Sequence, residues 1–202
     1  MKRYVLPILA ALLLSSCIGI ETQISFRNDG SGTVRLNYRI SQFMKNLDVG
    51  KEEKTLPLPV SRDDFIRAAE GIDGLRLLSV NQRENEQDVF VEARMEFDRV
   101  EAVNQLSREG QIDASLAAQD GTRSFKLLIY RGQENAEISE DSLKMVEAFF
   151  EGYELTYTIN TPAPIKRYSL GELSQDKRTL TYRVTVPELL KQKKKIFLEL
   201  AW

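Results

Sequence analysis

Cys17 is the only cysteine in this 202-residue chain, and the chain contains no histidine. Histidine is the commonest general base near neutral pH and the commonest metal ligand in proteins. Its absence excludes zinc sites built from nitrogen and sulfur ligands, and it excludes nucleophilic pairs of serine or cysteine with histidine. Carboxylate-based hydrolysis and a serine–lysine dyad remain formally open. We expect no metal and no cofactor, and the single thiol is the most informative reactive group.

The residues in front of Cys17 have the order of a secretory signal peptide. Lys2 and Arg3 are followed by an apolar run over residues 4–14, and two small serines then precede the thiol. A helix that spans a bilayer needs about 20 apolar residues, and this run of about eleven is too short for one. The length and order instead predict a signal peptide over residues 1–16.

The sequence Leu14-Ser15-Ser16-Cys17 resembles the lipobox of bacterial lipoproteins. The resemblance implies that the Cys17 thiol receives a diacylglyceryl group, that the chain is cleaved before Cys17, and that the new amine is acylated, for example with palmitate. Two acyl chains hold a protein stably at a bilayer, whereas one chain gives only marginal binding. Two alternatives stay open: an ordinary secretory signal cut at another position, and a Cys17 that packs as a small buried hydrophobe.

Ile18 bears on which membrane holds the protein. Lipoproteins that stay in the inner membrane of many diderm bacteria carry aspartate at this position, and isoleucine stands here instead. By that resemblance we expect a cell-envelope protein anchored in the outer membrane, at its periplasmic leaflet or at the surface. The membrane would then be its first partner, reached through the Cys17 lipid.

The composition of the processed chain is that of an ordinary folded domain. Removal of residues 1–16 leaves 26 cations and 30 anions, a net charge of −4, and the whole chain is 42% hydrophobic and 29% charged. Proteins that bind nucleic acid usually carry a basic face, so nothing here indicates a nucleic-acid partner. Residues 17–202 are enough for one domain that buries its core without disulfides.

Hydrophobic periodicity predicts an α+β fold for this domain. Apolar and polar side chains alternate in most of the apolar segments, which indicates strands with one buried and one wet face. We expect a mainly antiparallel sheet of about eight to nine strands with three helices on one face, in a two-layer arrangement. The expected strands cover residues 20–27, 33–40, 75–83, 88–97, 125–131, 153–159, 165–170, 179–186 and 195–202, and the expected helices cover 61–72, 98–107 and 139–152.

Several local signals refine this prediction. The sequence Asp29-Gly30-Ser31-Gly32 is typical of a tight hairpin turn, because it lacks the residues that complete a phosphate loop or a calcium loop. Ser61 is expected to cap one helix, and Asp98 is expected to cap another with Glu101 in the capping-box position. Residues 165–170 and 179–186 are expected to pair as a hairpin, and residues 110–122 show no clear period.

Two groups of residues are candidates for binding. An aromatic group could line an apolar ligand cavity, although packing in an ordinary core is the simpler interpretation; its members are Phe149, Phe150, Tyr153 and Tyr157, with Tyr168 and Tyr182 nearby in sequence. A basic group could contact anionic headgroups at a membrane surface. It comprises Lys191, Lys193, Lys194 and Lys195, and the alternative is a solvated turn that guards the last strand.

Residues 14–40 together resemble a loose class of bacterial envelope lipoproteins that includes the LppM-like group. The shared features are the lipobox, the first strand, the Asp-Gly-Ser-Gly turn and the second strand. The group is associated with the cell envelope and with lipid binding, and it supplies no catalytic residues. This chain departs from it because residues 160–202 contain no second hydrophobic segment that would act as an added anchor.

We expect from these observations a non-enzymatic lipoprotein of the cell envelope. Its domain would act as a binding or assembly module for a lipid or for another envelope protein. The alternative is a carboxylate-dependent hydrolase of an envelope polymer, which needs two acids converging in a cleft with one of them kept protonated by burial. The sequence marks out no pair of acids for that role.

Overall fold

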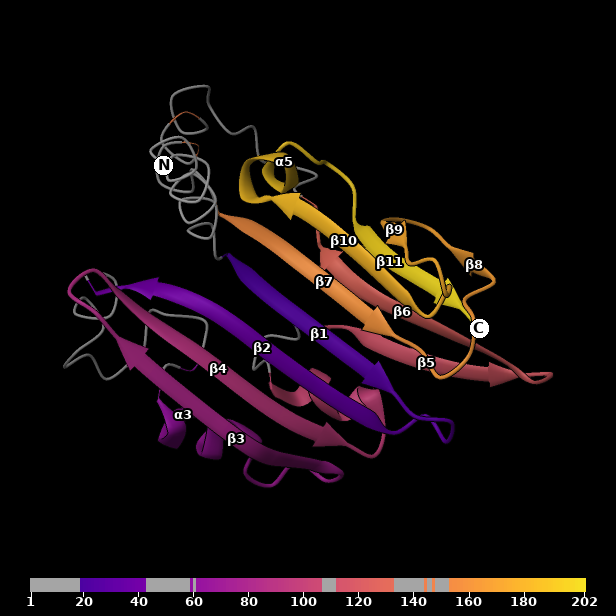
Figure 1. Ribbon diagram of the computed structural model, residues 1–202, viewed down its shortest axis with the longest axis horizontal. Coiled ribbons are helices and arrows are strands. Elements are labelled where there is room, and N and C mark those ends of the chain that lie inside the picture. The colour runs from indigo at the N-terminus through magenta and orange to yellow at the C-terminus, as the bar shows by residue number, and fades with distance from the viewer. Residues whose placement is uncertain are drawn as a thin grey trace, which may run out of the picture.

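The computed structural model describes residues 19–42, 59, 61–106, 112–132, 144, 147 and 153–202. Within them the chain forms an α+β structure dominated by strands (Figure 1). The prediction of eight to nine strands in one sheet is wrong, because the described residues form eleven strands in two sheets. The elements are β1 (Ile20–Phe26), β2 (Gly32–Ser41), α3 (Arg62–Ala69), β3 (Leu75–Glu84), β4 (Asp88–Phe97), η2 (Val100–Leu106), β5 (Ala114–Gln119), β6 (Thr122–Tyr130), β7 (Glu154–Asn160), β8 (Arg167–Tyr168), β9 (Glu172–Leu173), β10 (Thr179–Thr185), α5 (Val186–Leu190) and β11 (Ile196–Ala201).

The larger sheet has seven strands in the order β3-β4-β2-β1-β7-β10-β9. β1 lies at its centre, where it pairs antiparallel with β2 and parallel with β7, so that Ile24 is opposite both Val34 and Ile159. All three side chains are buried, as the alternation of apolar and polar residues predicts. The intervening polar residues form the opposite face of this sheet, which we call the outer face.

The turn between β1 and β2 confirms the prediction for residues 29–32. Gly30 has a positive φ of 96°, which a residue with a Cβ rarely adopts. The Asp29 carboxylate accepts hydrogen bonds from the Ser31 amide at 2.9 Å and the Ser31 hydroxyl at 2.7 Å. These bonds lower the pKa of Asp29, so the closed turn is favoured when this residue is ionised.

A second sheet with the order β5-β6-β11-β8 lies behind the first in Figure 1. Four aromatic residues connect the two sheets. The Phe26 ring of β1 lies 5.8 Å from Phe97 of β4, 5.0 Å from Phe125 of β6 and 5.2 Å from Trp202 beyond β11, all between ring centroids. One buried cluster therefore contains residues of both sheets, together with Phe65 of α3.

The short helices show where local signals were right and where tertiary contacts overrode them. Ser61 caps α3 in a capping box with Asp64, and this confirms the predicted cap. The expected α-helix at 98–107 is instead the 3-10 helix η2, and the Asp98–Glu101 capping box is wrong. The Glu101 carboxylate accepts from the Leu116 amide at 2.9 Å, and the Asn104 side chain pairs with the backbone of Ala114. Both side chains thus make hydrogen bonds to backbone groups of the edge strand β5.

Three further differences involve pairing partners and short elements. Residues 165–170 and 179–186 do not form a hairpin with each other, because β8 pairs with β11 while β9 pairs with β10. β5 lies in the segment 110–122 that shows no period, and α5 was not predicted although Thr185 and Glu188 form a capping box there. The expected helix 139–152 falls outside the described residues except for Lys144 and Glu147, which are helical.

The aromatic cluster should hold the two sheets together, and a matched pair of substitutions tests this. Phe26→Ala should lower the free energy of unfolding by about 3–5 kcal/mol, because it leaves a cavity among packed rings. Phe90→Ala, on the outer face of β4, should lower it by less than about 1 kcal/mol. Urea unfolding followed by tryptophan fluorescence measures both. Equal losses would show that the cluster is not the connection between the sheets.

Candidate functional site

The end of the larger sheet where β1 begins is fixed by close backbone packing at Gly19. A Cβ atom on Gly19 would collide with the backbone of Glu154, including its carbonyl oxygen. Because glycine has no Cβ, it permits two backbone segments to approach each other this closely. The chain is thus held against β7 only two residues after Cys17, which itself lies outside the described residues.

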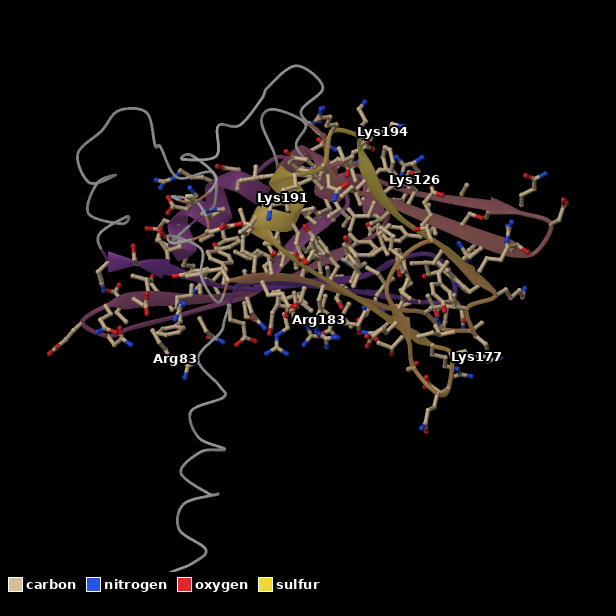
Figure 2. All side chains as sticks on the ribbon, turned by 90° about the horizontal axis from the view of Figure 1, so that it is seen from above. Arg83, Lys126, Lys177, Arg183, Lys191 and Lys194 are labelled. Carbon is tan, nitrogen blue, oxygen red and sulfur yellow. The ribbon has the colours of Figure 1, made fainter. Side chains whose placement is uncertain are left out.

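The predicted lysine group lies at this same end of the sheet. Glu154 of β7 is opposite Thr185 of β10, where β10 ends and α5 begins. α5 leads into the segment Lys191–Lys195, which we call the lysine loop, and Figure 2 shows Lys191 and Lys194 there. All four lysines of the loop are exposed, and Lys191 Nζ lies 3.1 Å from Glu147 Oε1. The backbone of Lys193 packs closely against Gly132, just after β6.

The predicted aromatic group is brought together only in part within the described residues. Tyr157 lies on the inner side of β7, opposite Thr22 and Tyr182, and packs partly buried against the core. Burial raises the pKa of Tyr157 to about 12. The Tyr153 ring lies under the Arg39 guanidinium at 4.7 Å. Tyr168 is exposed on β8 in the other sheet, so it does not join them.

Phe149 and Phe150 lie outside the described residues, so the apolar cavity stays a prediction. Tyr157 occupies the position of an ordinary core residue at the margin of the cluster. Two hollows of the described surface are lined by other residues.

A groove of about 210 Å³ crosses the outer face of the larger sheet. Its floor contains four residues that lie directly opposite one another on β1, β2, β4 and β3. We call Glu21, Asn37, Glu92 and Asn81 the central row. Beside it, Phe90 of β4 lies opposite both Arg39 and Arg83. Sequence reasoning missed the groove, because alternation predicts which residues face outward but not which ones become neighbours across strands.

The charges in this groove are balanced. Arg35 Nη2 lies 2.7 Å from Glu92 Oε1, and the Asn37 amide donates to Glu21 Oε2 at 3.2 Å. Arg83 is exposed and makes no ion pair or hydrogen bond with other described residues. Glu21 is exposed and the Glu92 side chain is 40% exposed, so both acids are open to solvent. The groove therefore offers charged and hydrogen-bonding groups to a ligand.

Next to the groove, Glu96 of β4 joins two arginines on the outer face. Its carboxylate accepts from Arg27 and from Arg76, the latter at 3.0 Å, and these bonds lower the pKa of Glu96. These two ion pairs of Glu96 are on the surface, where salt bridges contribute little to stability. It shows that the outer face is organised by side-chain pairing.

A second, wider hollow of about 460 Å³ lies on the smaller sheet. Its lining includes the small residues Ser115, Ala117 and Ser124 and the cations Lys126 and Arg167. The Lys126 ammonium lies 3.9 Å from the centre of the Phe197 ring and 2.9 Å from Glu199. Lys126 is thus engaged with both Glu199 and the Phe197 ring.

Two further observations concern the described residues only. They contain no group of three or more acids that could hold a metal ion. None of their helices is both long enough and apolar enough to cross a membrane.

Comparisons with known proteins give a distant likeness. No protein-family model matches the chain, and no curated protein is similar to it. Among solved structures, the NMR structure of the folded domain of Mycobacterium tuberculosis LppM is similar at 8% sequence identity, with a TM-score of 0.49. The match covers 92% of this chain and 88% of the other. A likeness this distant establishes neither a shared family nor a shared function.

Proposed function

We propose that this protein is a non-enzymatic lipoprotein of the bacterial cell envelope, tethered through an acylated Cys17. The observation that supports this most directly is the position of Gly19, which is packed against β7 at the same end as the lysine loop. Two residues of extended chain reach at most about 7 Å. A lipid on Cys17 therefore places this end of the domain next to the headgroups.

The lysine loop acts in this proposal as a second contact with the membrane. Each lysine near an anionic surface adds about 1 kcal/mol of attraction, and the four side chains are exposed at the tethered end. The lipid supplies the anchorage and the lysines orient the domain. Ile18 favours the outer membrane as its location.

The folded body serves as the binding or assembly module for a lipid or an envelope protein. An apolar ligand would enter from the inner side of β7 near Tyr157, with Phe149 and Phe150 as further lining residues. The exposed acids of the outer face are ion-paired or solvated, so the geometry supports a binding role over hydrolysis of an envelope polymer.

Metabolic labelling tests the tether itself. Cells that express the full chain and are fed a clickable fatty acid should yield a labelled protein, because the Cys17 thiol and the new amine carry acyl chains. Cys17→Ala should lose the label completely and leave the protein uncleaved. Label that persists in Cys17→Ala, or intact-mass data showing an N-terminus at another residue, would contradict the proposal.

Chemical modification of lysines tests the orientation without any substitution. The acylated protein is placed in bilayers of phosphatidylcholine, with or without phosphatidylglycerol, and treated with a water-soluble amine reagent. Lys193, Lys194 and Lys195 should react about fivefold more slowly when the anionic lipid is present, as expected for about 1 kcal/mol per lysine. Peptide mass spectrometry gives the rates.

Lys166 and Lys177 are the internal controls, because both are exposed at the far end of the sheets, between β7 and β10. Their rates should be the same in both bilayers. Equal protection at the two ends would show that the lysine loop does not face the membrane.

A further inference from the structure

The outer-face groove carries one aromatic side chain at a position where the strand pattern calls for a polar one. Phe90 lies between the buried Val89 and Val91, so its ring projects from the polar face and is only partly covered. It lies opposite Arg39 on one side and Arg83 on the other. An aromatic ring held on a wet surface offers an apolar plane for a ligand that is otherwise polar.

The central row next to Phe90 supplies a continuous set of hydrogen-bonding groups. Carboxylates of Glu21 and Glu92 alternate with amides of Asn37 and Asn81 across four strands. Because neighbouring strands lie about 4.8 Å apart, the row extends over about 14 Å. Carboxylates accept hydrogen bonds and amides both donate and accept, so the row matches a ligand whose groups do both, as hydroxyls do.

The charge of the groove selects against ionic ligands. Two cations, Arg35 and Arg83, and two anions, Glu21 and Glu92, line it and give no net charge. The Arg35–Glu92 pair at 2.7 Å already uses one charge of each sign. A polyanion or a polycation would therefore be repelled by the groove as strongly as it is attracted. A neutral ligand would meet no such repulsion.

Asn37 adds a group that lacks a partner. Its Oδ1 atom is buried and accepts no hydrogen bond from the described residues, although its amide nitrogen donates to Glu21. Buried acceptors in folded proteins almost always have a donor, so an open one calls for an explanation. A ligand hydroxyl that reaches Asn37 after a small rotation of the amide would supply the donor.

From these features we infer that the groove binds a neutral oligosaccharide chain, with one sugar ring stacked on Phe90 and its hydroxyls bonded along the central row. The groove faces away from the second sheet, and Figure 2 shows Arg83 and Arg183 projecting on this side while Lys126 and Lys194 lie on the other. The open shape and the volume of about 210 Å³ fit a chain that runs across the strands, not an enclosed small molecule. This inference does not depend on the lipid tether.

A glycan array probed with the full chain in detergent tests the inference. The array presents neutral hexose and N-acetylhexosamine oligosaccharides, with sulfated and uronic-acid oligosaccharides and acidic and basic peptides for comparison. The protein should bind at least one neutral oligosaccharide with a Kd near or below about 1 mM, and bind the charged probes more weakly. No binding to any neutral oligosaccharide, or tighter binding to a charged probe or a peptide, would overturn the inference.

Variants of Phe90 connect any binding to the groove. Phe90→Ala should weaken the bound oligosaccharide about tenfold or more, and Phe90→Trp should retain the affinity because it keeps an aromatic plane. Phe197→Ala is the matched control, since it removes a partly buried aromatic ring on the other sheet. Near-ultraviolet circular dichroism confirms folding of each variant. Unchanged affinity in Phe90→Ala, or an equal loss in Phe197→Ala, would place the sugar elsewhere and overturn the inference.

Discussion

The close approach of Gly19 to the backbone of Glu154 is the constraint on which the functional account depends. Because no side chain fits between the two strands at this point, Gly19 is held against β7, two residues after the position expected to carry the lipid. The parallel pairing of β1 with β7 then fixes the direction in which both strands run from Gly19. A flexible linker would leave the domain free to tumble at the surface, whereas this arrangement gives it a defined end.

Because the aromatic cluster joins the two sheets, fixing the tethered end also fixes the orientation of the whole domain. Phe26 of β1 contacts rings from β4, from β6 and from the residue after β11, so both sheets follow the position of the first strand. The lysine loop connects α5 to β11 and packs against Gly132, two residues after β6, so its position is set by the same core. The groove of the outer face likewise keeps a fixed relation to the tethered end, since Glu21 belongs to β1.

The sequence predicted those features that depend on near neighbours. The two-residue period of β1, β2 and β4, the turn at Gly30 and the cap at Ser61 are local, and all are present. What failed required contacts between distant segments. Glu101 has the spacing of a capping residue but bonds to β5, and residues 167–168 have the pattern of a hairpin strand but pair with β11. A strand's own period says which face is buried and not which strand lies beside it.

The same limit explains what could be foreseen of the binding surfaces. Lys191–Lys195 is a run in the sequence, so the basic group was visible without a structure. The central row is assembled from four strands, and its members are separated by as many as 71 positions, from Glu21 to Glu92. Phe90, between two inward-facing valines, was a local signal that the polar face of β4 carries an aromatic ring as well as solvated groups.

The orientation of the acylated protein on a bilayer tests the central claim most directly. Paramagnetic relaxation by gadolinium chelated to lipid headgroups, measured by NMR on the full chain in nanodiscs, reports which amides lie near the surface. The account predicts strong broadening at residues 19–21 and 191–195 and little at residues 174–178 at the far end of the sheets. Broadening that is uniform, or strongest at residues 174–178, would contradict it.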